Sequence, residues 1–260
     1  MLQATRNLLA ARSLNEAGDP CLFAERAGFD ADQWQRAALS SSSKQMLLLC
    51  SRQSGKSTVT ALLALHEALY HEASLVLLLA PAQRQSQELF LKLKTHLNAL
   101  ASLPVSIVEE SSLRITFSNG SRVVTLPGDE KTIRGYSGVR LLICDEAARV
   151  PDSLYYAVRP MLAVSGGRII LLSTPFGKRG FFYREWGEGG EAWHRLKITA
   201  RECPRISADW LEAERRAIGD WWFAQEYECQ FVDTIDQVFS SAHIEAALDP
   251  TITLPDWWNE

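Results

Sequence analysis

Three consecutive residues, Gly55, Lys56 and Ser57, carry the groups that a phosphate-binding loop needs. Glycine lets the backbone come close to phosphate oxygens, lysine adds a mobile positive charge, and the serine hydroxyl can bind Mg²⁺. The three residues follow an apolar run at 46–49 and precede a helix-like stretch at 58–70. A strand, a tight loop and a helix in this order are the setting of a nucleotide-binding P-loop.

In such a loop the backbone N–H groups point toward the phosphates, and the positive end of the following helix strengthens the attraction. The residues that we expect to bind the phosphates are Gln53, Ser54, Gly55, Lys56, Ser57 and Thr58. Cys50 departs from the pattern, because a P-loop usually opens with glycine. The alternative is a helix start with an exposed lysine, and the loop alone does not decide between the two.

Two acidic residues, Asp145 and Glu146, end a second apolar run at 141–144. Such a run predicts a buried strand, and the carboxyl ends of strands in an open α/β sheet are where ligands bind. About ninety residues after a P-loop, this pattern is that of a Walker B motif, in which Asp145 holds Mg²⁺ and Glu146 orients and deprotonates the attacking water. An exposed Asp-Glu turn is the alternative for the pair in isolation. Together the two motifs predict ATP hydrolysis.

Two further pairs are weaker candidates for the same site. Ser173 and Thr174 follow an apolar run at 168–172, where small hydroxyl residues can sense the γ-phosphate; the alternative is an ordinary turn before proline. Trp34 and Gln35 stand upstream of the P-loop, where an aromatic ring can stack on adenine and an amide can bind the edge of the base. The alternative for that pair is a helix N-terminus with a buried tryptophan.

The remaining apolar patterns predict the elements that position these residues. Unalternated apolar runs, as at 74–80, are typical of strands buried on both faces. We expect helices at 83–100, 207–218 and 220–231, a strand at 193–199, and a hairpin of strands 113–118 and 121–126 around Asn119-Gly120. The predicted fold is α/β, a P-loop NTPase (RecA/ASCE-like) with a mainly parallel sheet, helices on both faces and an inserted β-hairpin.

At 260 residues and 47% hydrophobic content, the chain can bury one large core. We expect a helical arm at 1–28, the P-loop ATPase core at 29–201 and an acidic helical subdomain at 202–260. That last region holds 3 Lys/Arg and 13 Asp/Glu, so the net charge of −4 does not exclude a nucleic-acid partner. Five scattered cysteines favour a reducing compartment, and the apolar runs are too short for a transmembrane helix, so no membrane partner is expected.

Taken together, these stretches resemble the ATPase domain of the large terminase subunit of tailed bacteriophages, over roughly residues 29–245. The resemblance rests on Trp34-Gln35, Ser51-Arg-Gln-Ser-Gly-Lys-Ser57, Ile133-Arg-Gly135, Leu142-Ile-Cys-Asp-Glu-Ala147, Ser173-Thr-Pro175 and Glu226-Tyr-Glu-Cys-Gln-Phe231. It implies a motor that uses Mg-ATP to drive double-stranded DNA into a procapsid.

The resemblance also implies roles for individual residues. Gln35 falls on the adenine-contacting position, Ser173-Thr-Pro175 on a motif that couples hydrolysis to motion, and Arg52 on a loop arginine that senses the γ-phosphate. Motors of this family are rings in which a neighbour's arginine, an arginine finger, can complete the site, and Arg134 and Arg140 are the candidates. The alternative for Arg134 is a local ion pair with a carboxylate such as Asp129 or Glu130. The expected catalytic residues are thus Glu146, Lys56, Arg52 and Arg134, and the expected Mg²⁺ ligands are Ser57 and Asp145.

The partners implied by the resemblance are double-stranded DNA, the portal protein, the small terminase subunit and further copies of the chain, which form a ring on the portal and are monomers in solution. The expected location is the cytoplasm of the bacterial host. Relatives carry a nuclease domain that would begin after about residue 245, and with fifteen residues left we expect this chain to lack it. The alternatives are a superfamily-2-like DNA helicase and an inactive prophage remnant that acts only as an assembly module.

Overall fold

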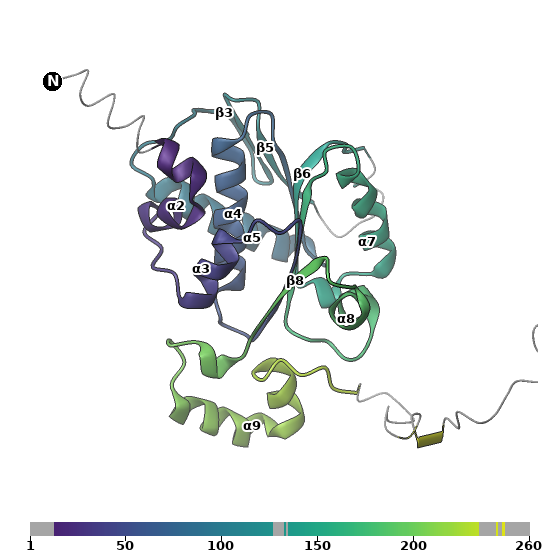
Figure 1. Ribbon diagram of the computed structural model, residues 1–260. Helices are drawn as coiled ribbons and strands as arrows, with labels where there is room; N and C mark the ends of the chain where they lie inside the picture. The colour runs from purple at the N-terminus through teal and green to yellow at the C-terminus, as the bar shows by residue number, and fades with distance from the viewer. Residues whose placement is uncertain (1–12, 127–132, 134, 234–242, 244–245, 248–260) are drawn as a thin grey trace, which may run out of the picture.

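The computed structural model describes residues 13–126, 133, 135–233, 243 and 246–247. Within them, eight strands form one sheet in the order β3-β4-β5-β2-β6-β7-β1-β8 (Figure 1). The strands are β1 (Gln45–Cys50), β2 (Leu75–Leu79), β3 (Ile107–Glu110), β4 (Arg114–Phe117), β5 (Arg122–Leu126), β6 (Val139–Asp145), β7 (Arg168–Ser173) and β8 (Trp193–Ile198). All neighbours from β5 to β8 in that order pair in parallel, whereas β3 and β4 are antiparallel. The predicted α/β fold with a mainly parallel sheet is confirmed.

Alternate residues of the central strands belong to two separate cores. In β1, Met46 and Leu48 pack into one core, and Leu47 and Leu49 pack into the other. All four side chains are at most 1% exposed. Both faces of the strand are therefore covered, and this is why its sequence shows no alternation of apolar and polar residues.

Helices cover both faces of the sheet, as the sequence predicts. Figure 1 shows α2, α3, α4 and α5 on one side and α7 and α8 on the other. The helices are α2 (Pro20–Arg26), α3 (Gln33–Ser40), α4 (Lys56–Tyr70), α5 (Gln83–Ala99), α7 (Asp152–Val158), α8 (Gly180–Glu188) and α9 (Ala208–Glu226), with short 3₁₀ turns η1 (Ala147–Arg149), η2 (Arg159–Leu162) and η3 (Ala200–Glu202). No element is predicted for the residues of α7, because seven residues are too few for a helical period to stand out.

The predicted hairpin around Asn119-Gly120 is confirmed, since β4 and β5 pair antiparallel on either side of it. Gly120 has a φ of +81°, a backbone conformation that glycine adopts without strain. The hairpin is part of the main sheet, because β5 also pairs in parallel with β2. Strand β3 was not predicted, and all four of its residues are exposed, so its sequence carries no burial pattern.

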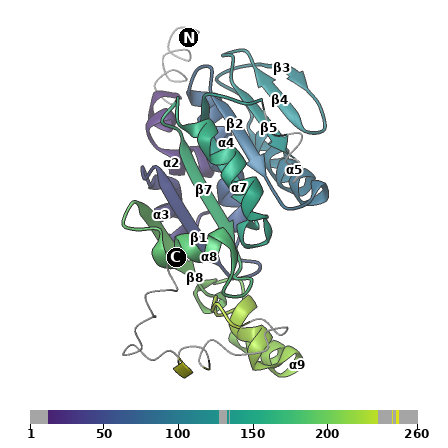
Figure 2. The same cartoon turned by 90° about the vertical axis from the view of Figure 1, so that its right-hand side faces the viewer.

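Helix α9 lies below the sheet in both views (Figure 1, Figure 2). It joins the predicted helices 207–218 and 220–231 across a kink at Gly219, whose φ is +80°. The prediction for 227–231 is wrong, because α9 ends at Glu226 and Cys229 has a positive φ of 53°. Beyond the helix, the carbonyl of Tyr227 accepts a hydrogen bond from the Ala200 N–H at 2.8 Å, so the chain turns back toward the end of β8.

The predicted N-terminal arm contains α2, and its Phe23 side chain is fully buried in the core formed with α3 and α4. The division of the chain at 28 and 201 stays a prediction. Among the described residues, no helix has both the length and the apolar character that crossing a bilayer demands.

A tight turn before β7 gives a stability prediction. A Cβ on Gly167 would lie 2.1 Å from the Val139 carbonyl oxygen and 2.9 Å from Leu162 Cδ2. We expect Gly167→Ala to lower the free energy of unfolding by about 2 kcal/mol or more, because backbone must move to make room. Gly187→Ala is the matched control, since its Cβ meets nothing within 4 Å and alanine favours a helix over glycine. Urea unfolding measures both, and equal stabilities would contradict the prediction.

Candidate functional site

The carboxyl ends of three neighbouring parallel strands form the candidate site. Strand β7 lies between β1 and β6 and pairs with both. The P-loop follows β1, the acidic pair ends β6, and Ser173 ends β7. Because parallel strands all end at the same edge of a sheet, segments far apart in the sequence meet there.

The loop between β1 and α4 has a backbone that favours glycine at position 55. Gly55 is the N-cap of α4 with a φ of +90°, and a Cβ there would lie 2.8 Å from the Gln35 side-chain nitrogen. Gln53 also has a positive φ, of 59°. The N–H of Thr58 bonds the Gly55 carbonyl at 3.1 Å and so belongs to the first turn of the helix. Cys50 is fully buried at the end of β1, and burial raises the pKa of its thiol.

Lys56 is buried at 8% exposure, and its ammonium lies 3.2 Å from Glu146 Oε1. Burial by itself lowers the pKa of a lysine, but the charges of Glu146 and Asp145 outweigh it and the pKa of Lys56 is raised. The ammonium therefore stays charged at neutral pH. The alternative of an exposed lysine at a helix start does not describe this side chain.

Asp145 and Ser57 form the second contact across the site. The Ser57 hydroxyl donates a hydrogen bond to Asp145 Oδ2 at 3.0 Å. Burial, followed by the charge of Glu146, raises the pKa of Asp145, whereas Lys56 and the Ser57 hydrogen bond oppose the rise. A hydroxyl and a carboxylate oxygen side by side are ligands that suit Mg²⁺. The donors present thus fit the metal that the sequence predicts.

Ser173 and Thr174 lie against the same acidic turn and are 0% and 1% exposed. The Ser173 hydroxyl accepts from the Ala148 N–H at 3.2 Å and lies 3.5 Å from Glu146 Oε2. The Ser173 hydroxyl therefore contacts the turn that carries Glu146. Thr174 Oγ1 accepts a hydrogen bond at 3.2 Å from Arg149, which belongs to the same turn.

Arg149 is a site residue that the sequence analysis missed. One of its terminal nitrogens donates to Glu146 Oε2 at 3.3 Å and to Thr174 Oγ1 at 3.2 Å. Its guanidinium carbon also lies 4.5 Å from the centre of the Phe176 ring. The turn η1 brings Arg149 back beside Glu146, three residues earlier, and this i, i+3 spacing after an acidic pair is the signal that could have found it.

Glu226, at the end of α9, was noted in the sequence only as part of a motif. Its Oε2 lies 2.5 Å from Arg52 Nε, and its backbone carbonyl accepts from the Arg52 N–H at 3.1 Å. The hydrogen bond to Glu226 is the main cause of a raised pKa for Arg52. Arg52 thus lies at the site, held by a carboxylate of α9.

Gln35 and Trp34 belong to the start of α3. The Gln35 carbonyl oxygen accepts from the Asp32 N–H at 2.8 Å, which caps the helix, and its amide nitrogen donates to the Ser54 carbonyl at 3.2 Å. Gln35 is 1% exposed, so its amide supports the P-loop directly. Trp34 is 8% exposed and packs in the core, as in the alternative of a buried tryptophan. The adenine contacts of both residues stay predictions.

Two arginines, Arg134 and Arg140, are the candidates for the arginine that a neighbouring chain would supply. Arg134 lies outside the described residues. Arg140 is the second residue of β6, and its Nε lies 3.4 Å from Glu67 Oε1. It stands five residues before Asp145, which at about 3.3 Å per residue puts it near the opposite edge of the sheet.

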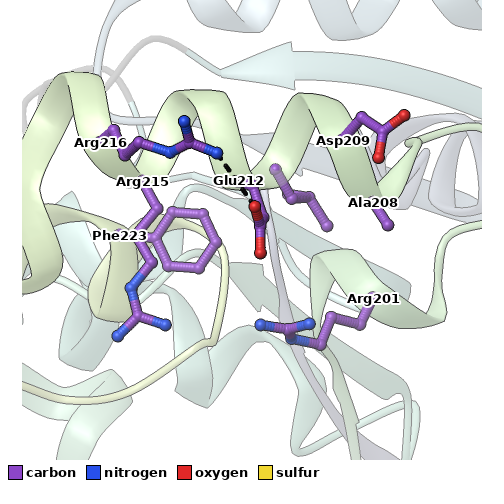
Figure 3. A pocket seen from close by; sticks show the side chains of 8 residues that line it. Arg201, Ala208, Asp209, Glu212, Arg215, Arg216 and Phe223 are labelled. Atoms are coloured by element: carbon purple, nitrogen blue, oxygen red, sulfur yellow. Dashed lines mark hydrogen bonds and ion pairs between the residues drawn. The ribbon is translucent and has the colours of Figure 1, made fainter.

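A cavity of about 410 Å³ beside α9 is separate from this site (Figure 3). Its charged lining residues are Arg201, Asp209, Glu212, Arg215 and Arg216. Arg216 pairs with Glu212 at 3.0 Å and Arg215 with Asp220 at 2.5 Å, so two of its three arginines already have carboxylate partners. No predicted nucleotide-binding residue lines it.

Comparison with known proteins adds sequence relatives. A family model described as terminase large subunit, T4likevirus-type, N-terminal, matches residues 47–246. The large terminase subunit of Thermus virus P23-45 is 28% identical over an alignment of 270 positions, which covers 90% of this chain and 54% of the relative. A probable large terminase subunit of Enterobacteria phage P7 is 26% identical over 190 residues, and the match covers 64% of this chain and 37% of the relative. The chain spans about half the length, or less, of these curated relatives.

Solved structures share the fold. The large terminase ATPase domain of Thermus phage P74-26 matches with a TM-score of 0.69 at 22% identity, over 80% of this chain and 97% of that one. The large terminase of a thermophilic bacteriophage, in complex with ADP, matches with a TM-score of 0.64 at 15% identity. The match covers 77% of this chain and 51% of that one. Since the family model spans most of the sequence, with the P-loop and the acidic end of β6 inside it, this chain belongs to the terminase large subunit family through that family's N-terminal domain.

Proposed function

We propose that this chain is the ATP-hydrolysing motor domain of a phage terminase large subunit, which couples hydrolysis to the movement of double-stranded DNA into a procapsid. One observation carries the proposal. The first two residues of α4, Lys56 and Ser57, lie 3.2 Å and 3.0 Å from the acidic pair Glu146 and Asp145 at the end of β6. A cation, a hydroxyl and two carboxylates in this arrangement are the parts that phosphoryl transfer from ATP to water uses.

The proposed roles follow from these contacts. The P-loop backbone and Lys56 bind the phosphates of ATP, while Glu146 orients the attacking water and takes its proton. Ser57 and Asp145 would hold Mg²⁺, which neutralises charge on the phosphates when bound. Arg52 lies at the mouth of the loop with its side chain 57% exposed, where it can turn toward the γ-phosphate.

The nucleotide and the partners rest on relatives. The structural relative that was solved in complex with ADP was also solved in complex with ATP-γ-S, which supports ATP as the substrate here. By family membership the partners are double-stranded DNA, the portal protein, the small terminase subunit and further copies of the chain in a ring. The place of action is the cytoplasm of the host cell, at the portal vertex of the procapsid.

Phosphate release tests the proposal directly. The purified chain is expected to release phosphate from ATP with Mg²⁺, to stop when EDTA removes the metal, and to respond to added duplex DNA. Hydrolysis that ignores duplex DNA but rises with single-stranded DNA would favour a helicase. No hydrolysis at any protein concentration, with or without DNA, would contradict the proposal.

Lys56→Ala is expected to weaken ATP binding. A charged hydrogen bond contributes about 1.5–3 kcal/mol, so the Kd should rise roughly 10- to 100-fold. Titration with a fluorescent ATP analogue in the presence of Mg²⁺ measures it. Lys44→Ala is the matched control, because Lys44 precedes β1 at the opposite edge of the sheet and its ammonium bonds the Gly166 carbonyl at 2.7 Å. Equal affinities in both variants would show that Lys56 does not contact the phosphates.

A further inference from the structure

The end of helix α9 enters the ATPase site although most of the helix lies outside it. Gln225 and Glu226 are 2% and 7% exposed, and they contact loops that follow two different strands. Gln225 Oε1 accepts from the Gly177 N–H, after β7, at 3.2 Å. The Glu226 carbonyl accepts from the Arg52 N–H, after β1, at 3.1 Å. The last turn of α9 is therefore bonded to the loops that surround the nucleotide position.

Arg149 connects Glu226 to Glu146. Its NH1 lies 3.3 Å from Glu146 Oε2, and its NH2 lies 3.7 Å from Glu226 Oε1. The same NH1 donates to Thr174 Oγ1, and the guanidinium lies over the Phe176 ring. A guanidinium that lies over an aromatic ring and pairs with carboxylates on two sides has little freedom to turn. Arg149 thus holds the Glu146 carboxylate in one place.

These ion pairs form a chain of alternating charge. It runs from Arg52 to Glu226, from there to Arg149 and Glu146, and it ends at Lys56. Both ends lie in the P-loop, whereas Glu226 belongs to α9. Glu226, Arg149 and Glu146 each have two oppositely charged neighbours in this chain of ion pairs. A change in the position of one of these side chains therefore alters the ion pair of the next. A physical connection between α9 and Glu146 therefore exists through one arginine.

We propose that Arg149 and Glu226 are positioning residues of the ATPase site. Arg149 holds Glu146 in place for the attacking water, and Glu226 ties Arg149 and Arg52 to the end of α9. The inference rests on the proposed function, because it needs Glu146 to be the base. Neither residue contacts the nucleotide in this role, and both act through Glu146 and Arg52.

The test compares kcat and KM for ATP in four single variants. Arg149→Met is expected to lower kcat about 10- to 100-fold, since a small misplacement of a catalytic group costs up to that much. KM, and the Kd of a fluorescent ATP analogue, should change less than threefold. Arg149→Lys should recover part of the loss because it restores the charge, and Glu226→Gln should lower kcat without changing the Kd.

Arg179→Met is the matched control. The Arg179 guanidinium also lies 4.5 Å from the centre of the Phe176 ring, but it makes no ion pair with the described residues. Its kcat should equal that of the wild type in an assay without DNA. A loss in Arg179→Met as large as that in Arg149→Met would show that packing on Phe176, and not the chain of ion pairs, is what matters.

The double variant separates a linked pair from two independent residues. With both Arg149→Met and Glu226→Gln, kcat should fall below that of Arg149→Met by less than the loss seen in Glu226→Gln alone, because part of the effect of Glu226 passes through Arg149 and only the part that passes through Arg52 remains. A further loss equal to that of Glu226→Gln, or a wild-type kcat in Arg149→Met, would overturn the inference while leaving the proposed function intact. If the wild type itself hydrolyses no ATP, the proposed function fails and this inference fails with it. Should Arg149→Met not fold, Arg149→Lys and Glu226→Gln carry the same test.

Discussion

Glu146→Gln is expected to bind ATP as well as the wild type and to lose nearly all turnover. The amide keeps the size of the side chain and can still lie near Lys56 and Arg149, but it cannot take a proton from water. Removal of a general base costs about 10²- to 10⁴-fold in rate. Affinity should hold or improve, because a carboxylate 3.2 Å from the Lys56 ammonium competes with phosphate for that charge.

The measurement pairs single-turnover phosphate release with a binding titration. Glu185→Gln is the matched control, since Glu185 also pairs with an arginine, Arg159, and its side chain is 15% exposed against 23% for Glu146. It lies away from the P-loop, so its turnover should match the wild type. If Glu146→Gln hydrolyses ATP at the wild-type rate, another group is the base.

Specific activity is expected to climb with protein concentration, because we expect an arginine of a neighbouring chain to complete the site. An arginine that neutralises charge on the γ-phosphoryl raises the rate about 10³-fold or more. Within the described residues, Arg52 and Arg149 lie at the site, and each already pairs with a carboxylate. Arg134, the first candidate, lies outside those residues, and Gly135 and Gly138 follow it in the sequence.

Mixing two inactive variants tests this prediction. Arg134→Ala supplies the base and Glu146→Gln supplies the arginine, so the mixture should recover activity that neither chain has alone. A mixture of Arg140→Ala with Glu146→Gln shows whether Arg140, the second candidate, supplies it instead. Activity that is independent of concentration, with no recovery in either mixture, would mean that one chain completes its own site. The alternative role of Arg134, a local pair with Asp129 or Glu130, would then stand.

The parts of the site that sequence predicts are those encoded locally. The residues of a P-loop are adjacent in the sequence, so the motif can be read directly. An acidic pair that follows a buried apolar run lies at the end of a strand, and therefore at the edge of the sheet. Gln35 is instructive, because Asp32 three residues earlier gives the pattern of a capping box. That pattern predicts the hydrogen bond to the Asp32 N–H, whereas the expected adenine contact rests on the position of Gln35 upstream of the P-loop and on the family resemblance.

The parts that could not be predicted depend on the folded chain. Arg149 and Glu226 are far apart in the sequence, and no spacing rule places one beside the other. Helix α9 ends where Tyr227 and Cys229 contact the end of β8 and the residues after it. The helical periodicity of 220–231 does not reveal these contacts, so the predicted helix was too long. Strand β3 is marked only by its pairing with β4, because none of its side chains is buried.

Strand β3 has a consequence for how the protein avoids aggregation. It is one outer strand of the sheet, and such a strand presents unpaired backbone groups to which another chain could add. Its two exposed apolar residues, Ile107 and Val108, would favour that addition. The next two are Glu109 and Glu110, which pair with Arg114 and Lys94. Desolvating these charges would be costly, so this edge resists strand-to-strand association between copies of the protein.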